Sequence, residues 1–84
     1  MRIITQAEFD ALPVVDERKQ CPGHTYYSAL KSFPEGCDFG PRCHFGPRCH
    51  FGPRCHFGPW CIFAKGCRFG VWCRAERPFW PFET

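Results

Sequence analysis

No stretch of this 84-residue chain is apolar over the roughly 20 residues that a membrane-spanning helix requires. The opening residues, 1–6, are too polar for a secretory signal peptide. These two absences predict a cytoplasmic protein without membrane contact, in a reducing compartment where cysteines stay as thiols. The chain is also too short for a comfortably stable single core, which favours a stack of repeated units.

Acidic residues are missing between Phe39 and Arg74, although this stretch contains six basic ones. The basic residues are Arg42, Arg48, Arg54, Lys65, Arg68 and Arg74. Because the net charge of the whole chain is only +3, the asymmetry lies in how the charge is distributed. Such a distribution is compatible with an anionic partner.

A six-residue period runs from Phe33 to Arg74, where cysteines recur every six residues and a phenylalanine precedes each by four. The cysteines are Cys37, Cys43, Cys49, Cys55, Cys61, Cys67 and Cys73, and the phenylalanines are Phe33, Phe39, Phe45, Phe51, Phe57, Phe63 and Phe69. This period fits neither a helix nor the irregular spacing of a disulfide framework. Residues two apart share one face of a strand, and Gly-Pro favours a turn. The pattern therefore predicts a short strand and a corner in every unit, with Phe and Cys pointing inward.

The first 20 residues are interpreted as a cap on one end of the stack, the alternative being a frayed terminus. Thr5 and Glu8 form a capping-box pattern at the start of a short helix, and Pro13 ends it. Val14 and Val15 add extended residues, and residues 16–20 are expected to form a charged connector.

Residues 21–32 follow the six-residue phase only loosely and predict a degenerate coil at best. Counting back by sixes places Cys21 and Tyr27 in the Phe column and Thr25 and Lys31 in the Cys column, where lysine is a poor interior residue. Because Cys21 lies outside the main cysteine series, we expect it to be the most accessible thiol. His24 is expected to be a loop residue.

The unit F-G-x-x-C-x resembles the hexapeptide repeat of left-handed parallel β-helices, in which a bulky apolar residue, a glycine and a small residue take these positions. The likeness covers residues 33–74 well and 21–32 loosely, and it departs from the family in using Phe throughout. It implies an all-β solenoid, a small left-handed parallel β-helix of about three triangular coils with an N-terminal capping helix. The short length, the cysteine series and the opening helix are also similar to small Cys-rich hexapeptide proteins of tailed bacteriophages and prophages.

If three units close one coil, residues 18 apart stack on strands roughly 4.8 Å apart. The expected phenylalanine ladders are Phe33–Phe51–Phe69, Phe39–Phe57 and Phe45–Phe63, and the cysteine ladders are Cys37–Cys55–Cys73, Cys43–Cys61 and Cys49–Cys67. Arg42 would lie against Trp60 and Arg54 against Trp72, as cation–π pairs of about 0.5–1 kcal/mol each. Burial of the phenyl rings, about 1.5–3 kcal/mol each, should dominate stability.

Metal binding and cofactor binding are not expected. Cysteine gaps of five residues exceed the C-x₂₋₄-C spacing of zinc sites, and neighbours such as Cys43 and His44 point to opposite faces of a strand. Two alternatives remain, a thiophilic ion held by inward cysteines and disulfides along a ladder, but parallel Cβ vectors suit a disulfide poorly. We expect apolar, free thiols that fill space between rings.

Catalysis is the next alternative, because many members of the resembled family are acyltransferases that use a histidine. His44, His50 and His56 would lie on three sides of one coil, and the acid-free stretch offers no carboxylate to orient any of them. About three coils also leave little wall for a coenzyme. We therefore expect no enzyme activity and no small-molecule substrate.

Residues 75–84 break the repeat and carry aromatic residues between prolines. Two interpretations remain: the segment folds over the last coil as a lid, or it docks on another subunit or partner.

The main functional hypothesis is a structural or adaptor-type protein that presents a rigid surface to a protein partner, which is either another copy or a different protein. The phage likeness implies an accessory protein in a bacterial host. The candidate partner surface comprises Arg42, Arg48, Arg54, Trp60, Trp72, Phe79, Trp80 and Phe82. The alternative is an anion- or nucleic-acid-binding module, but the three arginines of the identical units form a belt around the shaft and do not gather on one face.

Overall fold

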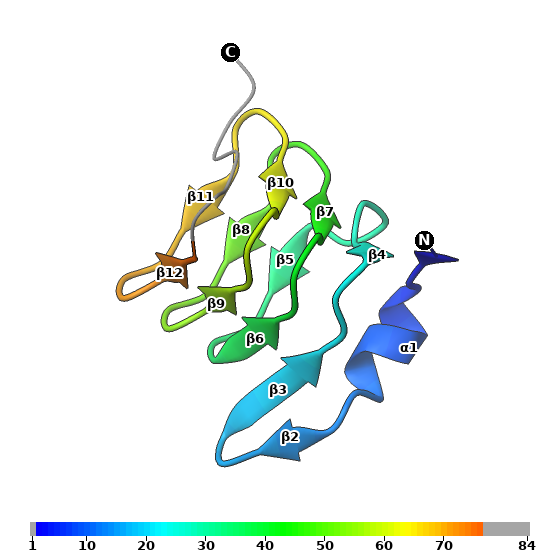
Figure 1. The fold of residues 1–84 in the computed structure, drawn as a ribbon, viewed down its shortest axis with the longest axis vertical. Coiled ribbons are helices and arrows are strands. Elements are labelled where there is room, and N and C mark those ends of the chain that lie inside the picture. Colours follow the sequence, from blue (N-terminus) through cyan, green and yellow to red (C-terminus); the bar gives the residue numbers. More distant parts are fainter. Residues whose placement is uncertain (1, 77–84) are drawn as a thin grey trace.

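The structure, a computed structural model, describes residues 2–76 and consists mainly of short strands wound into a solenoid (Figure 1). Phe79, Trp80 and Phe82 lie outside the described residues, so both interpretations of the tail stay predictions. No helix in the described part of the chain has the length and apolarity needed to span a membrane.

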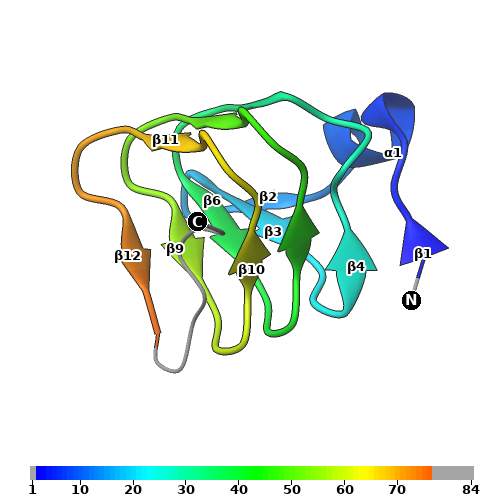
Figure 2. The same ribbon diagram turned by 90° about the horizontal axis from the view of Figure 1, so that it is seen from above.

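Three sheets form the sides of the solenoid, which makes about three turns (Figure 2). Side A contains β1 (Arg2–Ile3), β4 (Thr25–Tyr26), β7 (His44–Phe45) and β10 (Ile62–Phe63). Side C contains β5 (Ser32–Phe33), β8 (His50–Phe51) and β11 (Arg68–Phe69). Side B contains β2 (Val14–Val15), β3 (Arg18–Cys21), β6 (Cys37–Phe39), β9 (His56–Phe57) and β12 (Arg74–Ala75). The prediction of a three-sided β-solenoid with an N-terminal helix is confirmed.

The strand register places residues eighteen apart on top of one another. On side C, Ser32 pairs with His50 and His50 pairs with Arg68, in parallel strands. The same offset relates Asp38 to His56 on side B. Each coil therefore consists of three six-residue units, as the repeat predicts, and the chain visits the sides in the order A, C, B.

The lumen is filled by three columns of stacked rings. In one column the ring centroid of Phe51 lies 4.8 Å from that of Phe33 and 5.0 Å from that of Phe69, with nearly parallel planes. The other columns are Phe39–Phe57 and Tyr27–Phe45–Phe63. Rings of different columns meet edge to face, as Phe45 and Phe51 do at 5.0 Å. Both stacked and edge-to-face geometries are favourable for aromatic pairs, so the predicted phenylalanine ladders are confirmed.

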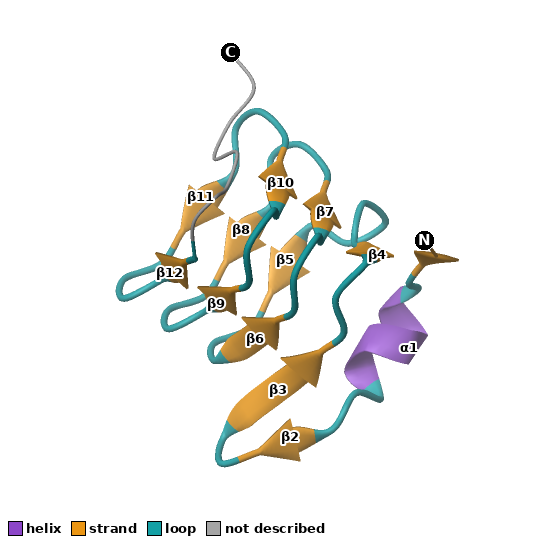
Figure 3. Cartoon of the chain, viewed as in Figure 1, coloured by secondary structure: helices purple, strands orange, loops and turns teal. Residues whose placement is uncertain are grey.

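The N-terminal helix closes one end of this aromatic core (Figure 3). Helix α1 (Gln6–Asp10) begins at the predicted capping box, in which Thr5 and Glu8 each accept a hydrogen bond from the other's backbone. Its Phe9 is buried and meets the rings of Tyr27 and Phe33 edge to face. The Nζ of Lys19 donates to the carbonyl of Phe9 and lies over its ring. The short N-terminal helix is confirmed, and through Phe9 it packs on rings of the first coil.

The first coil is more regular than the sequence suggested. Residues 16–20 are not a connector: Asp16 and Glu17 form the turn of an antiparallel hairpin between β2 and β3. Strand β3 then pairs in register with β6, and Cys21 lies beside Phe39. The misfit at Lys31 is resolved locally, because Leu30 is buried there while Lys31 points to solvent.

The sequence predicts that the glycine of each unit favours a turn, but the structure gives it a different role. The left-handed residue of each corner is not that glycine; φ lies between 52° and 83° at His24, Gly36, Arg42, Arg48, Arg54, Trp60, Gly66 and Trp72. A Cβ built on Gly52 would lie 2.7 Å from the backbone nitrogen of Glu35 in the preceding coil, and Gly58 meets Pro41 at the same distance. Glycine is therefore required because two coils approach closely at this position.

Candidate functional site

Most cysteine side chains belong to the interior, and the thiols of the repeat cysteines contact backbone carbonyls at the corners. The Sγ of Cys49 lies 3.1 Å from the carbonyl of Gly46, and that of Cys67 lies 3.4 Å from the same oxygen. All eight cysteines are free thiols. The expectation for Cys21 is wrong: it is buried at 5 % exposure because it occupies a phenylalanine position, and Cys73 in the last coil is the least buried thiol.

Two of these thiols, those of Cys37 and Cys49, are held in their neutral form. The nearby thiol of Cys21, together with burial, raises the pKa of Cys37 to about 12. Burial and the neighbouring Cys67 raise the pKa of Cys49 to about 11. In the described residues no group of three or more Cys, His, Asp or Glu side chains is arranged to hold a metal ion. Buried and neutral, Cys37 and Cys49 fill space between the rings as small apolar side chains.

Raised thiol pKa values predict a loss of stability at alkaline pH. An unfolded thiol has a pKa near 8.5, so only the unfolded chain releases these protons as the pH rises above about 9. The stabilising effect is complete below about pH 8.5 and is lost progressively towards pH 11–12. Urea unfolding at pH 7, 9 and 10.5 under reducing conditions should show a falling free energy of unfolding.

The matched control replaces Cys37 and Cys49 with alanine. This variant should be less stable at pH 7, because it has cavities, but should lose less stability between pH 7 and 10.5. An identical alkaline loss in both proteins would contradict the assignment to these thiols.

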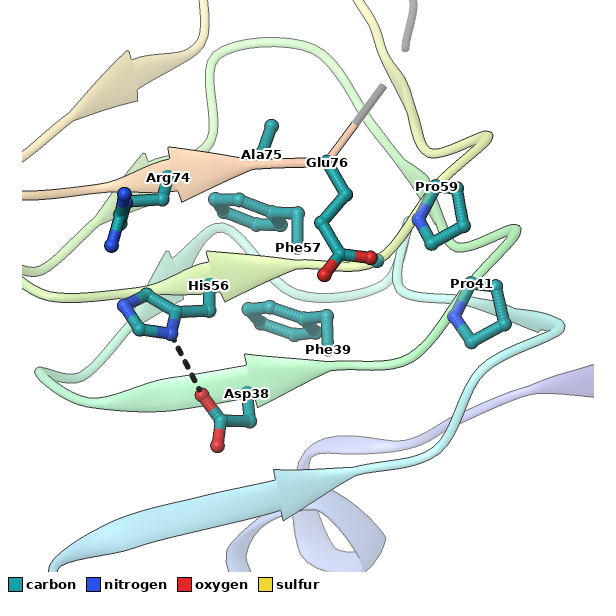
Figure 4. Close-up of a pocket in the computed structure, with 10 residues that line it drawn as sticks. Asp38, Phe39, Pro41, His56, Phe57, Pro59, Arg74, Ala75 and Glu76 are labelled. Atoms are coloured by element: carbon teal, nitrogen blue, oxygen red, sulfur yellow. Dashed lines mark ion pairs between the residues drawn. The ribbon is translucent and has the colours of Figure 1, made fainter. Parts of the chain in front are cut away.

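The three repeat histidines point outward on three sides, as predicted. His44, His50 and His56 pair with Ile62, Arg68 and Arg74 respectively in the coil above. The acid-free stretch itself supplies no carboxylate, but the register brings one from before it near His56, whose Nδ1 lies 3.7 Å from the Oδ1 of Asp38 (Figure 4). Asp38 precedes the acid-free stretch in sequence but lies directly below His56 in the register.

Asp38 also anchors Arg18, which the sequence analysis did not single out. The Nε of Arg18 donates to the Oδ1 of Asp38 at 2.6 Å, and its Nη2 donates to the carbonyl of Arg54 at 2.8 Å. The hydrogen bond to Asp38 raises the pKa of Arg18. Both side chains are half-buried, so this is a fixed link between the first three coils of side B.

Two shallow hollows flank this link on the outside of side B. The first, of about 600 Å³, is bordered by Asp38, His56, Arg74 and Glu76, with Pro41 and Pro59 at its far edge (Figure 4). The second, of about 620 Å³, is lined by Arg18, Arg54, His56, Trp72, Cys73 and Arg74. Both are surface features.

The corners that border side B carry the exposed tryptophans. At the B/A corner (residues 40–43 and 58–61) the guanidinium carbon of Arg42 lies 5.7 Å from the centroid of a Trp60 ring, so this predicted cation–π pair is confirmed. At the C/B corner (residues 52–55 and 70–73), Arg54 and Trp72 line one hollow. The cation–π contacts seen in residues 2–76 are those of Arg42 and Lys19, so the predicted pairing of Arg54 with Trp72 is not observed.

The predicted partner residues thus divide between different parts of the surface. Arg42, Trp60, Arg54 and Trp72 border side B, whereas Arg48 lies at the A/C corner (residues 46–49 and 64–67). Arg18, Asp38 and Arg74 join the side B group through the register. Counting back eighteen residues from His56 would have identified Asp38 from the sequence.

No family model, no curated protein and no solved structure matches this chain. Neither a family nor a phage origin is therefore shown, and both stay predictions drawn from the repeat.

Proposed function

We propose that this protein is a non-catalytic adaptor whose side B docks a protein partner. The observation that carries the proposal is the position of Trp60 and Trp72 at the two opposite edges of this one side, both in the last coil. Tryptophan and arginine are the residue types most often responsible for binding energy at protein interfaces, and here an arginine lies one coil below each tryptophan.

The exposure of these tryptophans supports docking. Trp72 is 74 % exposed and Trp60 is 43 % exposed, although each would bury a large apolar area against a partner. Val71 beside Trp72 is 67 % exposed and extends the apolar edge. Because the phenyl columns fix the solenoid from inside, this surface is presented without rearrangement, which keeps the entropy lost on binding small.

The charge of side B favours a protein over a polymer of one charge sign. Its units, residues 16–21, 34–39, 52–57 and 70–75, contain four basic and four acidic residues. These are Arg18, Lys19, Arg54 and Arg74 with Asp16, Glu17, Glu35 and Asp38. Lys19 turns its Nζ to Phe9 at the capped end, but the remaining charges still give a surface of mixed sign. Such a surface matches a partner with complementary charges of both signs, and these patterns set specificity and register.

Two features argue against catalysis at this side. The separation of 3.7 Å between His56 and Asp38 exceeds hydrogen-bond distance, so the carboxylate does not fix the imidazole for proton transfer. The side chain of His56 is also about half exposed, and the hollows beside it are shallow. The likeness to small phage proteins supports an accessory role in the cytoplasm of a bacterial host, on resemblance alone.

Site-specific cross-linking tests the docking. A photoreactive benzoylphenylalanine replaces Val71 at the C/B corner, and the protein is illuminated in the cells that naturally express it. We expect one discrete protein adduct, which disappears when Trp60 at the opposite edge is replaced by alanine. The Trp60→Ala variant should keep its melting temperature within a few degrees, because the ring lies on the surface.

The matched control places the photoreactive residue at Ser32, which is exposed on side C. This position should give no adduct of the same mass. Adducts of equal yield from position 32, or an adduct from position 71 that persists in the Trp60→Ala variant, would contradict the proposal that side B docks the partner.

A further inference from the structure

The three sides of the solenoid differ sharply in charge when each hexapeptide is assigned to its side. The A/C corner and side C are built from residues 28–33, 46–51 and 64–69, which contain four basic residues and no acid. The basic residues are Lys31, Arg48, Lys65 and Arg68. In the units leading to side A, residues 22–27, 40–45 and 58–63, the one charged residue is Arg42. The formal charges of the side B units sum to zero. The net positive charge of the coils is thus concentrated along the A/C corner and side C.

The register brings these four cations into a single strip, which we call the basic strip. The backbone nitrogen of Arg48 donates to the carbonyl of Lys65 in the next coil at 3.0 Å. The Nζ of Lys31 reaches up to the carbonyl of Pro47 at 3.3 Å, beside Arg48. Arg68 stacks above His50 in the parallel strands of side C. The strip therefore crosses three coils, a length of about 10 Å at the usual strand spacing.

The side chains of the basic strip are exposed and keep their charge available. Lys31, Arg48, His50, Lys65 and Arg68 are all exposed to solvent. In residues 2–76 the ion pairs join Arg2 to Glu8, and Arg18 and His56 to Asp38, so none of them involves the strip. With no carboxylate in these units, the strip produces a local positive potential that the small net charge of the chain hides.

We infer that the basic strip binds the phosphate backbone of a nucleic acid. Cations in a row at this spacing suit successive phosphates, and contacts of this kind position a nucleic acid without reading its sequence. The inference is independent of docking at side B, since it uses other residues on other sides. It also differs from an arginine belt: of the three identical units only one contributes, through Arg48, and the irregular units supply the other cations.

Fluorescence anisotropy with a labelled thymidine 12-mer tests the inference, with RNA and duplex DNA of the same length as further arms. Binding at 50 mM salt should be independent of sequence. Four phosphate contacts predict a slope of log K against log salt of about −3 for the single strand and about −3.6 for the duplex. The stronger of the two arms identifies the form of nucleic acid that the strip prefers.

Two variants of equal charge separate the strip from net charge. The triple variant K31Q/K65Q/R68Q removes three cations from the strip, and R42Q/R54Q/R74Q removes three from other sides. The first should weaken binding at least about tenfold and reduce the slope by about 2 units, whereas the second should change affinity less than about threefold. Unchanged melting temperatures would show that both variants are folded.

Three outcomes would overturn the inference. The first is that no binding is detected at 50 mM salt, which would exclude nucleic acid as the ligand. The second is an equal loss of affinity in the two triple variants, which would show that binding depends on the net charge of the protein and not on the strip. The third is an equal affinity for polyglutamate of the same length, which would indicate that the strip binds acidic proteins instead.

Discussion

Replacing Phe51 with alanine is expected to lower the free energy of unfolding by about 3–5 kcal/mol. The Phe51 ring is 4 % exposed and stacks between Phe33 and Phe69, while the edges of Phe45 and Phe57 meet it at 5.0 Å. Alanine would leave a cavity in the middle of one column, at the point where rings of the other two columns meet it. Because small domains are stable by only about 5–15 kcal/mol, a large fraction of the stability should be lost, measured as a shift of the urea midpoint.

Phe51→Leu separates the volume of the ring from its geometry. Leucine keeps much of the apolar volume, so a loss well below that of alanine is expected if filling the lumen dominates. A loss as large as that of alanine would instead assign the effect to ring stacking, which contributes about 0.5–1.5 kcal/mol per pair beyond burial. A loss below about 1 kcal/mol for Phe51→Ala would contradict the view that the rings hold the solenoid together.

Gly52→Ala is expected to be clearly destabilising, although it adds only one methyl group. The new Cβ would lie 2.7 Å from the backbone nitrogen of Glu35 and 2.9 Å from the carbonyl carbon of Pro34. Backbone atoms cannot rotate away, so the two coils must separate and the ladder between them must stretch. Overpacking of this kind destabilises by about 1–3 kcal/mol, which thermal and urea unfolding would detect.

Gly46→Ala is the matched control, since Gly46 lies in an identical FGPRCH hexapeptide. Here the nearest atoms to a new Cβ are the Nζ of Lys31 and the carbonyl oxygen of Ser28, both at 3.4 Å. The next coil already carries Ala64 in this column. We expect a change within about 0.5 kcal/mol, with a small gain from the stiffer unfolded chain. Equal effects at the two glycines would refute the close-approach explanation.

The overall architecture could be predicted from the sequence because every unit repeats the same physical constraint. Phe and Cys two residues apart must face the same way on a strand, and a period of six closes a triangle only if every third unit stacks. The register of Phe33 on Phe51 follows from this arithmetic alone. No long-range information was needed, since each contact is with the equivalent residue of the next coil.

The predictions that failed concern residues whose neighbours differ from the repeat. Lys31 in the cysteine column predicts a degenerate first coil, but a local turn buries Leu30 in its place. The position of Cys21 outside the cysteine series predicts an accessible thiol, yet a phenylalanine position is interior whatever residue fills it. The requirement for glycine at the corners arises from the backbone of another coil, which local turn preferences cannot reveal.

The candidate site was only partly predictable for a related reason. The carboxylate beside His56 does not show in the charge pattern along the sequence, because Asp38 is eighteen residues away in the chain and adjacent only in the fold. Sorting every charge by side, once the coil length is known, separates the neutral side B from the basic strip. That sorting uses the sequence alone, but it depends on knowing which hexapeptide belongs to which side of the solenoid.

The coil length of eighteen residues has a consequence for how this protein can change in evolution. Loss of one hexapeptide from the middle would leave the fold intact, because Phe and Cys would still fall into columns. Every later residue would nevertheless rotate by one side, which would carry Trp72 to the A/C corner and Trp60 to the C/B corner. Such a deletion would cost the burial of one phenyl ring and would also disrupt recognition, because both tryptophans would change corners. Natural length variants should therefore differ by whole turns, with selection acting on the outer surface.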